Sequence, residues 1–390
     1  MPPEILTNKD YYLDAKLRSH NGLAIASPDM PANLASLFAV LGGRAERHRA
    51  YAEANLYSLR PRSIRFGFVD ENDVYAMAFA AEGTGHPPFD FIGINVGTPI
   101  TLLANFRQML SRRNVFPDVG DASLEAEDIP PMETLTTNAA LDQADAVEPR
   151  CPVRYLFAQY LAYTAFDFLY FHEQTHLRNG HFELWNQRGG GGALLEVAGH
   201  VTDGGHRNKL RRTIETDADC GAILWTLNAA HHEGRGRTQS SANFTSDAAY
   251  MAAIAMWGSQ ALVTRSTTFA VYVLCRLFHE DHQKQPPKAS EPYPSPAVRF
   301  RVVNETMRAI LSGNPGFYGF DACTFDGAQF ESIAAAEAAC ATICGRNPNV
   351  HEMTAAVDAE FSAFTEEFTS TWAEIRPELE RYKRGGNLAP

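Results

Sequence analysis

The feature that most constrains this 390-residue chain is a His-Glu-x-x-His motif, formed by His172, Glu173 and His176. It lies near the end of an apolar segment, residues 155–177, which is rich in Leu, Ala, Tyr and Phe and contains neither Pro nor Gly. Such a segment predicts a buried helix. Buried imidazole and carboxylate groups need polar partners, because burying them without partners is energetically costly. We therefore expect this helix to pack against a second element that supplies those partners.

The spacing of the two histidines suits a metal ion. Residues four apart on a helix share a face, so the His172 and His176 imidazoles can bind one tetrahedral Zn²⁺ ion. Glu173 is then placed to take a proton from a water ligand of that ion. The alternative is a pair of core histidines satisfied by ordinary hydrogen bonds. A second, partial match at His351 and Glu352 lacks the later histidine, which shows how short motifs also arise by chance.

A catalytic zinc site needs three protein ligands and one position for water. Glu215 and Asp219 stand four residues apart at the start of an expected helix at 212–225 and are followed by apolar sequence, so their shared face is expected to point inward. We predict that Glu215 is the third ligand and that Asp219 accepts a hydrogen bond from the outer nitrogen of a ligand histidine. An exposed acidic first turn of the helix is the alternative, and it fits Asp217 well.

His181 is a nearer candidate for the third ligand, but its position argues against it. Asn179 and Gly180 predict a helix end at which Gly180 is the left-handed cap. On a continued helix, His181 would face away from the two ligand histidines. We therefore do not expect His181 to bind the metal.

Taken together, the two motifs resemble a known group. A His-Glu-x-x-His helix followed by Glu215-x-x-Ala-Asp219 resembles the gluzincin metallopeptidases, nearest to the Lit-type phage-exclusion and HtpX-type peptidases. The resemblance covers residues 155–303 and includes the segment from Tyr293 to Arg299, in which Tyr293 stands where histidine is commoner. It implies a zinc peptidase with Glu215 as the third ligand. It also implies a mostly helical α+β fold with a zincin-like core.

We expect the chain to be a zinc-dependent metallopeptidase that cleaves a peptide or protein substrate, with Glu173 as general base. Tyr293 and Arg299 are the candidates to stabilise the oxyanion, although a structural ion pair explains Arg299 equally well. Two other functions stay open. The chain could be a non-proteolytic sensor or interaction protein that uses zinc to stabilise its fold, or a zinc hydrolase of a non-peptide substrate.

Composition and charge limit the classes of molecule and the location expected for this protein. The net charge of −12 argues against nucleic acid, because phosphate neutralisation needs clustered Lys and Arg. The start of the chain shows no signal-peptide pattern, which predicts a cytoplasmic protein with reduced cysteines. The apolar residues 248–278 contain Arg265 and several Ser and Thr, so we expect a buried core helix rather than a membrane span. The sequence leaves the substrate, the oligomeric state and any trigger of a latent enzyme open.

The pattern along the chain predicts a small N-terminal sheet and a C-terminal helical region. Residues 63–69 and 74–79 alternate as two strands paired around 70–73, and residues 91–96 form a third strand. The gluzincin resemblance implies that an edge strand lines the substrate cleft, and one of these strands could take that role; a plain structural sheet is the alternative. The acidic, Pro-containing residues 117–150 read as a solvated loop or lid. The expected regions are an N-terminal α/β region at 1–116, the acidic loop at 117–150, the metallopeptidase core at 151–310 and a helical region at 311–390.

Overall fold

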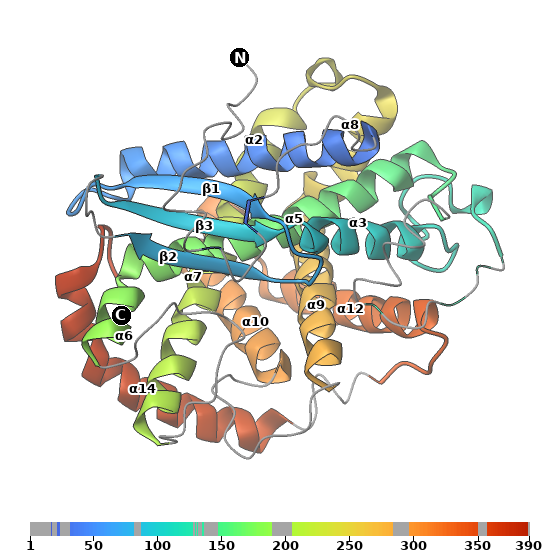
Figure 1. Cartoon of the computed structure of the whole chain (residues 1–390). Coiled ribbons are helices and arrows are strands. Elements are labelled where there is room, and N and C mark those ends of the chain that lie inside the picture. Colours follow the sequence, from blue (N-terminus) through green and yellow to red (C-terminus); the bar gives the residue numbers. More distant parts are fainter. Residues whose placement is uncertain are drawn as a thin grey trace.

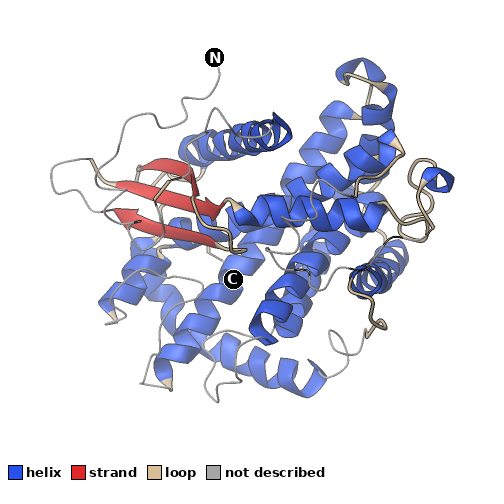
Figure 2. Cartoon of the chain, turned by 45° about the vertical axis from the view of Figure 1, so that its right-hand side comes forward, coloured by secondary structure: helices blue, strands red, loops and turns tan. Residues whose placement is uncertain are grey.

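The computed structural model of the chain is mostly helical and contains a small three-stranded sheet (Figure 2). This confirms the coarse fold prediction of a helical α+β protein with an N-terminal sheet and helices at the C-terminal end. The structure describes residues 17, 22–23, 32–81, 87–127, 129, 131, 135, 147–188, 205–283, 296–349 and 357–388. Tyr293 and the glycine-rich residues 189–192 lie outside the described residues.

The sheet has the order β1-β3-β2, with strands β1 (Ser63–Val69), β2 (Ala76–Ala81) and β3 (Phe89–Asn95) (Figure 1). β1 runs parallel to β3, and β2 runs antiparallel to β3. The expected pairing of the first two strands around residues 70–73 is therefore wrong. β3 is buried along its whole length, and a strand buried on both faces takes the centre of a sheet and separates its two partners.

The two faces of the sheet belong to different apolar clusters. Ile92 and Ile94 of β3 join the main core, whose buried side chains come from as far apart as Leu37 and Leu388. Phe89 and Phe91 point to the other face and pack in a smaller cluster. This alternation is what a period of two along a strand produces.

Helices form most of the rest of the described chain, and Figure 1 shows α5 and α7 behind the sheet and α2 along its β1 edge. Their bounds are α2 Ala32–Asn55, α3 Gly97–Leu110, α5 Pro152–Asn179, α6 His181–Gln187, α7 His206–Arg237, α8 Asp247–Trp257, α9 Gln260–Gln283, α10 Pro296–Gly313, α11 Pro315–Tyr318, α12 Ala322–Ile343 and α14 Val357–Tyr382, with short 3-10 turns η2 Ala122–Leu124 and η3 Ser241–Asn243.

The apolar segment expected as one helix at 248–278 is two helices, α8 and α9, separated at Gly258 and Ser259. The Ser259 hydroxyl accepts a hydrogen bond from the Leu262 amide, which caps the start of α9. By length and composition, Gln260–Phe278 could cross a membrane, but 78% of this window is buried inside the fold. A buried core helix passes the same test, so the segment gives weak evidence for a membrane span.

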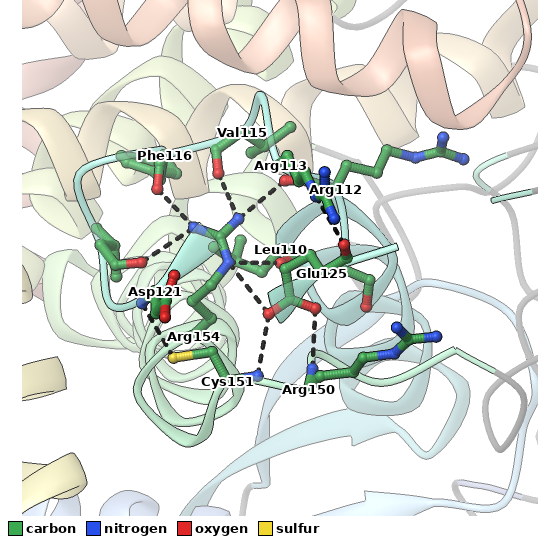
Figure 3. Close-up of polar contacts among 12 residues, drawn as sticks. Leu110, Arg112, Arg113, Val115, Phe116, Asp121, Glu125, Arg150, Cys151 and Arg154 are labelled. Atoms are coloured by element: carbon green, nitrogen blue, oxygen red, sulfur yellow. Dashed lines mark hydrogen bonds and ion pairs between the residues drawn. The ribbon is translucent and has the colours of Figure 1, made fainter. Parts of the chain in front are cut away.

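A buried arginine fixes the part of the acidic segment that precedes α5 (Figure 3). The Arg154 guanidinium donates hydrogen bonds to five backbone carbonyl groups, and it lies 3.4 Å from the Glu125 carboxylate. Glu125 in turn accepts from the amides of Arg150 and Cys151 at the start of α5. Farther on, the buried Leu135 donates its amide to Glu280 of α9. These described residues of the acidic segment are thus held against the core, while residues 136–146 of the expected lid lie outside the described residues.

A second buried charge group joins α2 to α5 and α7. Arg44 donates two hydrogen bonds to Asp167 and a third, of 2.7 Å, to Glu233. The His48 Nε2 atom also lies 3.0 Å from Asp167 Oδ1. Burial raises the pKa of the Asp167 carboxyl, but Arg44 and His48 outweigh that effect and hold the pKa below its usual range. The ion pair therefore stays charged at neutral pH although it is almost fully buried.

Candidate metal centre

The candidate centre lies where α5 and α7 pack closely. Gly221 of α7 faces Thr175 of α5, and a Cβ at Gly221 would come within 2.3 Å of the Thr175 hydroxyl oxygen. A glycine therefore permits an approach between the helices that any larger residue would prevent. This contact brings the acidic residues of α7 to the histidine face of α5, as the sequence predicts for Glu215 and Asp219.

Three ligand atoms converge between these helices. His172 Nε2 lies 3.1 Å from His176 Nε2 and 3.2 Å from Glu215 Oε2. His176 Nε2 lies 3.5 Å from the same Glu215 oxygen. All three side chains are buried. Within the described ranges, these three residues place their ligand atoms close enough together to hold one metal ion.

The size of this triangle can be tested against metal geometry. Ligand atoms about 2.0–2.1 Å from a tetrahedral ion lie about 3.3 Å from each other. The three observed separations, 3.1, 3.2 and 3.5 Å, bracket that value. Two imidazoles and one carboxylate are also a donor set that divalent transition metals accept. The residues present therefore fit a metal ion without rearrangement of the helices.

Electrostatics keep two of these ligands in the protonation state that a metal requires. Burial raises the pKa of the Glu215 carboxyl, but His176 and His172 outweigh this and hold it well below its usual range. Burial lowers the pKa of His176 to about 4, although Glu215 acts in the opposite direction. Burial also lowers the pKa of His172, but hydrogen bonds to Asp219 and Glu215 prevail and raise it. An ionised Glu215 and a neutral His176 are the forms that bind a cation.

Asp219 lies where the sequence prediction placed it. Its Oδ1 atom is 2.9 Å from His172 Nδ1, the ring nitrogen that faces away from the other ligands. Arg299 of α10 donates two hydrogen bonds of 2.9 Å to the two oxygens of the same carboxylate. This arrangement orients the His172 ring with Nε2 toward Glu215.

The same contacts show the structural ion pair of Arg299. Its guanidinium Nε and Nη2 atoms donate to Asp219, and this ion pair supports His172. These contacts do not test whether Arg299 also stabilises an oxyanion, which stays a prediction. Tyr293, the other candidate, lies outside the described residues.

The sequence reasoning missed a group behind His176. Its Nδ1 atom lies 3.0 Å from His181 Nδ1, and His181 Nε2 lies 3.1 Å from Asp217 Oδ2. Asp217 also accepts a hydrogen bond from the Asn179 amide. The expected helix end at Gly180 is present, with φ at +78°. However, α6 begins directly after it, and this turn brings His181 back toward His176. The signal available in the sequence was a histidine directly after a left-handed cap.

Glu173 follows His172 on α5 and is only 3% exposed. The three candidate ligands are equally buried, at 1–3% exposed. Comparison of the chain with protein-family models, with curated proteins and with solved structures finds no match. The candidate function therefore depends on the geometry of the residues themselves.

Proposed function

We propose that the protein is a zinc-dependent metallopeptidase with a zincin-like core, in which His172, His176 and Glu215 hold the ion. The observation that carries this proposal is the buried triangle of three ligand atoms with edges of 3.1, 3.2 and 3.5 Å. A triangle of this size supports one tetrahedral ion. The Asp219 carboxylate behind His172 adds support, because metal-binding histidines almost always donate their other N–H to such a partner.

The donor set accepts several divalent metals, and the neighbouring Glu173 is what supports the choice of zinc. Two histidines with one carboxylate are also the ligands of many non-haem iron sites, which are octahedral. The His-Glu-x-x-His helix adds a carboxylate, Glu173, next to a ligand, which a hydrolytic zinc site uses as its base.

In the proposed reaction, the ion, when bound, lowers the pKa of a water molecule and polarises the scissile carbonyl group. Glu173 accepts a proton from the attacking water and delivers it to the leaving amine. His172 and His176 keep their Nε2 atoms directed to one point, and Asp219 with Arg299 prevents the His172 ring from rotating. Burial of Glu173 excludes bulk water from the proton transfer.

The alternative of a zinc-stabilised sensor requires a closed fourth position. His181 and Asp217 lie beside the ligand His176 and are the nearby described groups that could fill it. His181 instead faces the Nδ1 side of His176, and Asp217 faces His181. Neither His181 nor Asp217 therefore closes the site as a fourth ligand. A cytoplasmic location and a peptide or protein substrate remain part of the proposal.

The test replaces Glu173 with Gln, which keeps the shape of the side chain and removes its basicity. Zinc content is measured by elemental analysis, and cleavage is measured on a library of quenched fluorescent peptides. We expect the variant to keep one zinc per chain and to lose turnover by at least about 10²-fold. Glu331→Gln, a change at an exposed residue of α12, is the matched control and should cleave at the native rate.

The outcomes separate the candidate functions. A Glu173→Gln variant that cleaves at the native rate would show that this residue is not the base. A wild-type chain that binds one zinc and cleaves no peptide would support a non-peptide hydrolase or a sensor. A chain that binds iron in preference to zinc would refute the zinc assignment.

A further inference from the structure

We propose that His181 and Asp217 form a positioning pair that makes His176 a ligand through its Nε2 atom. This inference rests on the proposed metal site and concerns residues outside its three ligands. Two distances carry it: His176 Nδ1 lies 3.0 Å from His181 Nδ1, and His181 Nε2 lies 3.1 Å from Asp217 Oδ2. His181 is fully buried and Asp217 is 4% exposed, so both contacts are shielded from bulk water.

The protons in this chain of contacts have one consistent arrangement. His176 Nε2 faces His172 Nε2 and Glu215 Oε2. This nitrogen must be unprotonated to bind a metal, so the proton of the neutral ring is on Nδ1. When His176 Nδ1–H donates a hydrogen bond to His181 Nδ1, the His181 Nδ1 atom is the acceptor and must be unprotonated. The proton of His181 therefore sits on Nε2, which lies 3.1 Å from Asp217 Oδ2. The negative charge of the carboxylate favours this tautomer of His181, and the tautomer of His181 in turn favours Nδ1–H on His176.

The fold around Gly180 holds His181 in this place. Gly180 has a φ of +78°, and a Cβ at this position would come within 2.4 Å of the Tyr382 Cβ. The backbone amide of Arg384 donates to the Arg178 carbonyl, which fixes the end of α5 against the segment after α14. Asn179 donates a further hydrogen bond to Asp217. The turn and the pair are therefore one buried unit, and His181 is held with little freedom to rotate.

Each ligand histidine thus has its own carboxylate on α7. Asp219 reaches His172 directly, and Asp217 reaches His176 through His181. Asp217 lies two residues after Glu215 in the sequence, and Asp219 lies four residues after it. A single helix thereby supplies one ligand and the supports of both others. The contacts of the pair also hold the His181 ring on the Nδ1 side of His176, away from the three ligand atoms.

The test compares His181→Ala, which removes the acceptor, with His181→Asn, whose side-chain oxygen can replace Nδ1 as acceptor. His206→Ala is the matched control, because His206 is an exposed histidine of α7. Zinc dissociation constants are measured by competition with a chelator, and the cobalt-substituted proteins are compared by their visible absorption. We expect His181→Ala to bind zinc about 10–100-fold more weakly and to change the cobalt spectrum. His181→Asn should recover most of the affinity, and His206→Ala should match the wild type.

A second measurement on the unmodified protein does not depend on whether the variants fold. Nitrogen-15 NMR of the zinc-loaded wild type, labelled at histidine, reports which ring nitrogen carries the proton. We expect Nδ1–H on His176 and Nε2–H on His181. A proton on His181 Nδ1, or a His181→Ala variant with wild-type zinc affinity and cobalt spectrum, would overturn the positioning pair alone. Failure of the wild-type chain to bind any metal would overturn both this inference and the proposed function.

Discussion

The closest helix contact at the centre gives a prediction whose size follows from the structure. Replacing Gly221 with Ala would put a methyl group 2.3 Å from Thr175 Oγ1 and 2.6 Å from Thr175 Cγ2. Ordinary contacts are longer by roughly 1 Å, so α5 and α7 must separate by about that distance. Metal sites tolerate changes in ligand distance of about 0.2 Å. Gly221→Ala should therefore weaken zinc binding by about 100-fold or more and destabilise the fold by about 1–3 kcal/mol.

The assay combines zinc competition with urea denaturation and uses a second change as a rescue. Thr175→Ala removes the two atoms in closest conflict and leaves the Thr175 Cβ at 3.0 Å, so the double variant should regain most of the affinity. Gly327→Ala is the control, because a Cβ at Gly327 of α12 meets nothing within 4 Å. Wild-type zinc affinity in Gly221→Ala, or a double variant as weak as the single one, would refute the argument that this contact sets the position of Glu215.

Three further outcomes are expected. Asp219→Ala should weaken zinc binding about 10–100-fold in chelator competition, because it removes the partner of a ligand histidine; unchanged affinity would contradict this role. Asp167→Asn should lower the free energy of unfolding by about 3–5 kcal/mol at pH 7, because it removes the buried carboxylate charge beside Arg44 and leaves Glu233 as the remaining acidic partner. The folded-state pKa of Asp167 is depressed, so the stabilisation by its carboxylate is present above the unfolded pKa of about 3.9 and declines as the pH falls below that value. The difference in unfolding free energy between wild type and Asp167→Asn, measured by urea denaturation, should therefore be smaller at pH 3 than at pH 7. Arg154→Met should destabilise the protein by about 3–5 kcal/mol in the same assay, because five buried carbonyls and Glu125 lose their donor; a loss below about 1 kcal/mol would show that water replaces it.

The candidate site was predictable to the extent that helix periodicity fixes it. His172 and His176 share a face because they are four apart, and Glu215 and Asp219 share a face for the same reason. Their apolar surroundings required the two faces to meet. The role of His181 was not predictable from periodicity, because it depends on the direction of the chain after a left-handed Gly180. The ion pair of Arg299 with Asp219 likewise depends on how α10 packs beside α7, which no local pattern encodes.

For the fold, local sequence patterns predicted where helices and strands lie but not which strands pair. The strand at Ser63–Val69 and the helix end at Asn179 followed from alternation and from a glycine cap. The strand order did not follow from such signals. The short connection at residues 70–73 resembles a hairpin turn, but β3 lies between β1 and β2 in the sheet. The break between α8 and α9 was also missed, since Gly258 within apolar sequence is compatible with a continuous helix.

The most direct test of the central claim is a crystal structure of the zinc-loaded protein with anomalous diffraction measured at the zinc absorption edge. The account predicts one anomalous peak per chain, about 2.0–2.2 Å from His172 Nε2, His176 Nε2 and a carboxylate oxygen of Glu215. A peak bound by other residues, or none within reach of these three side chains at saturating zinc, would contradict it.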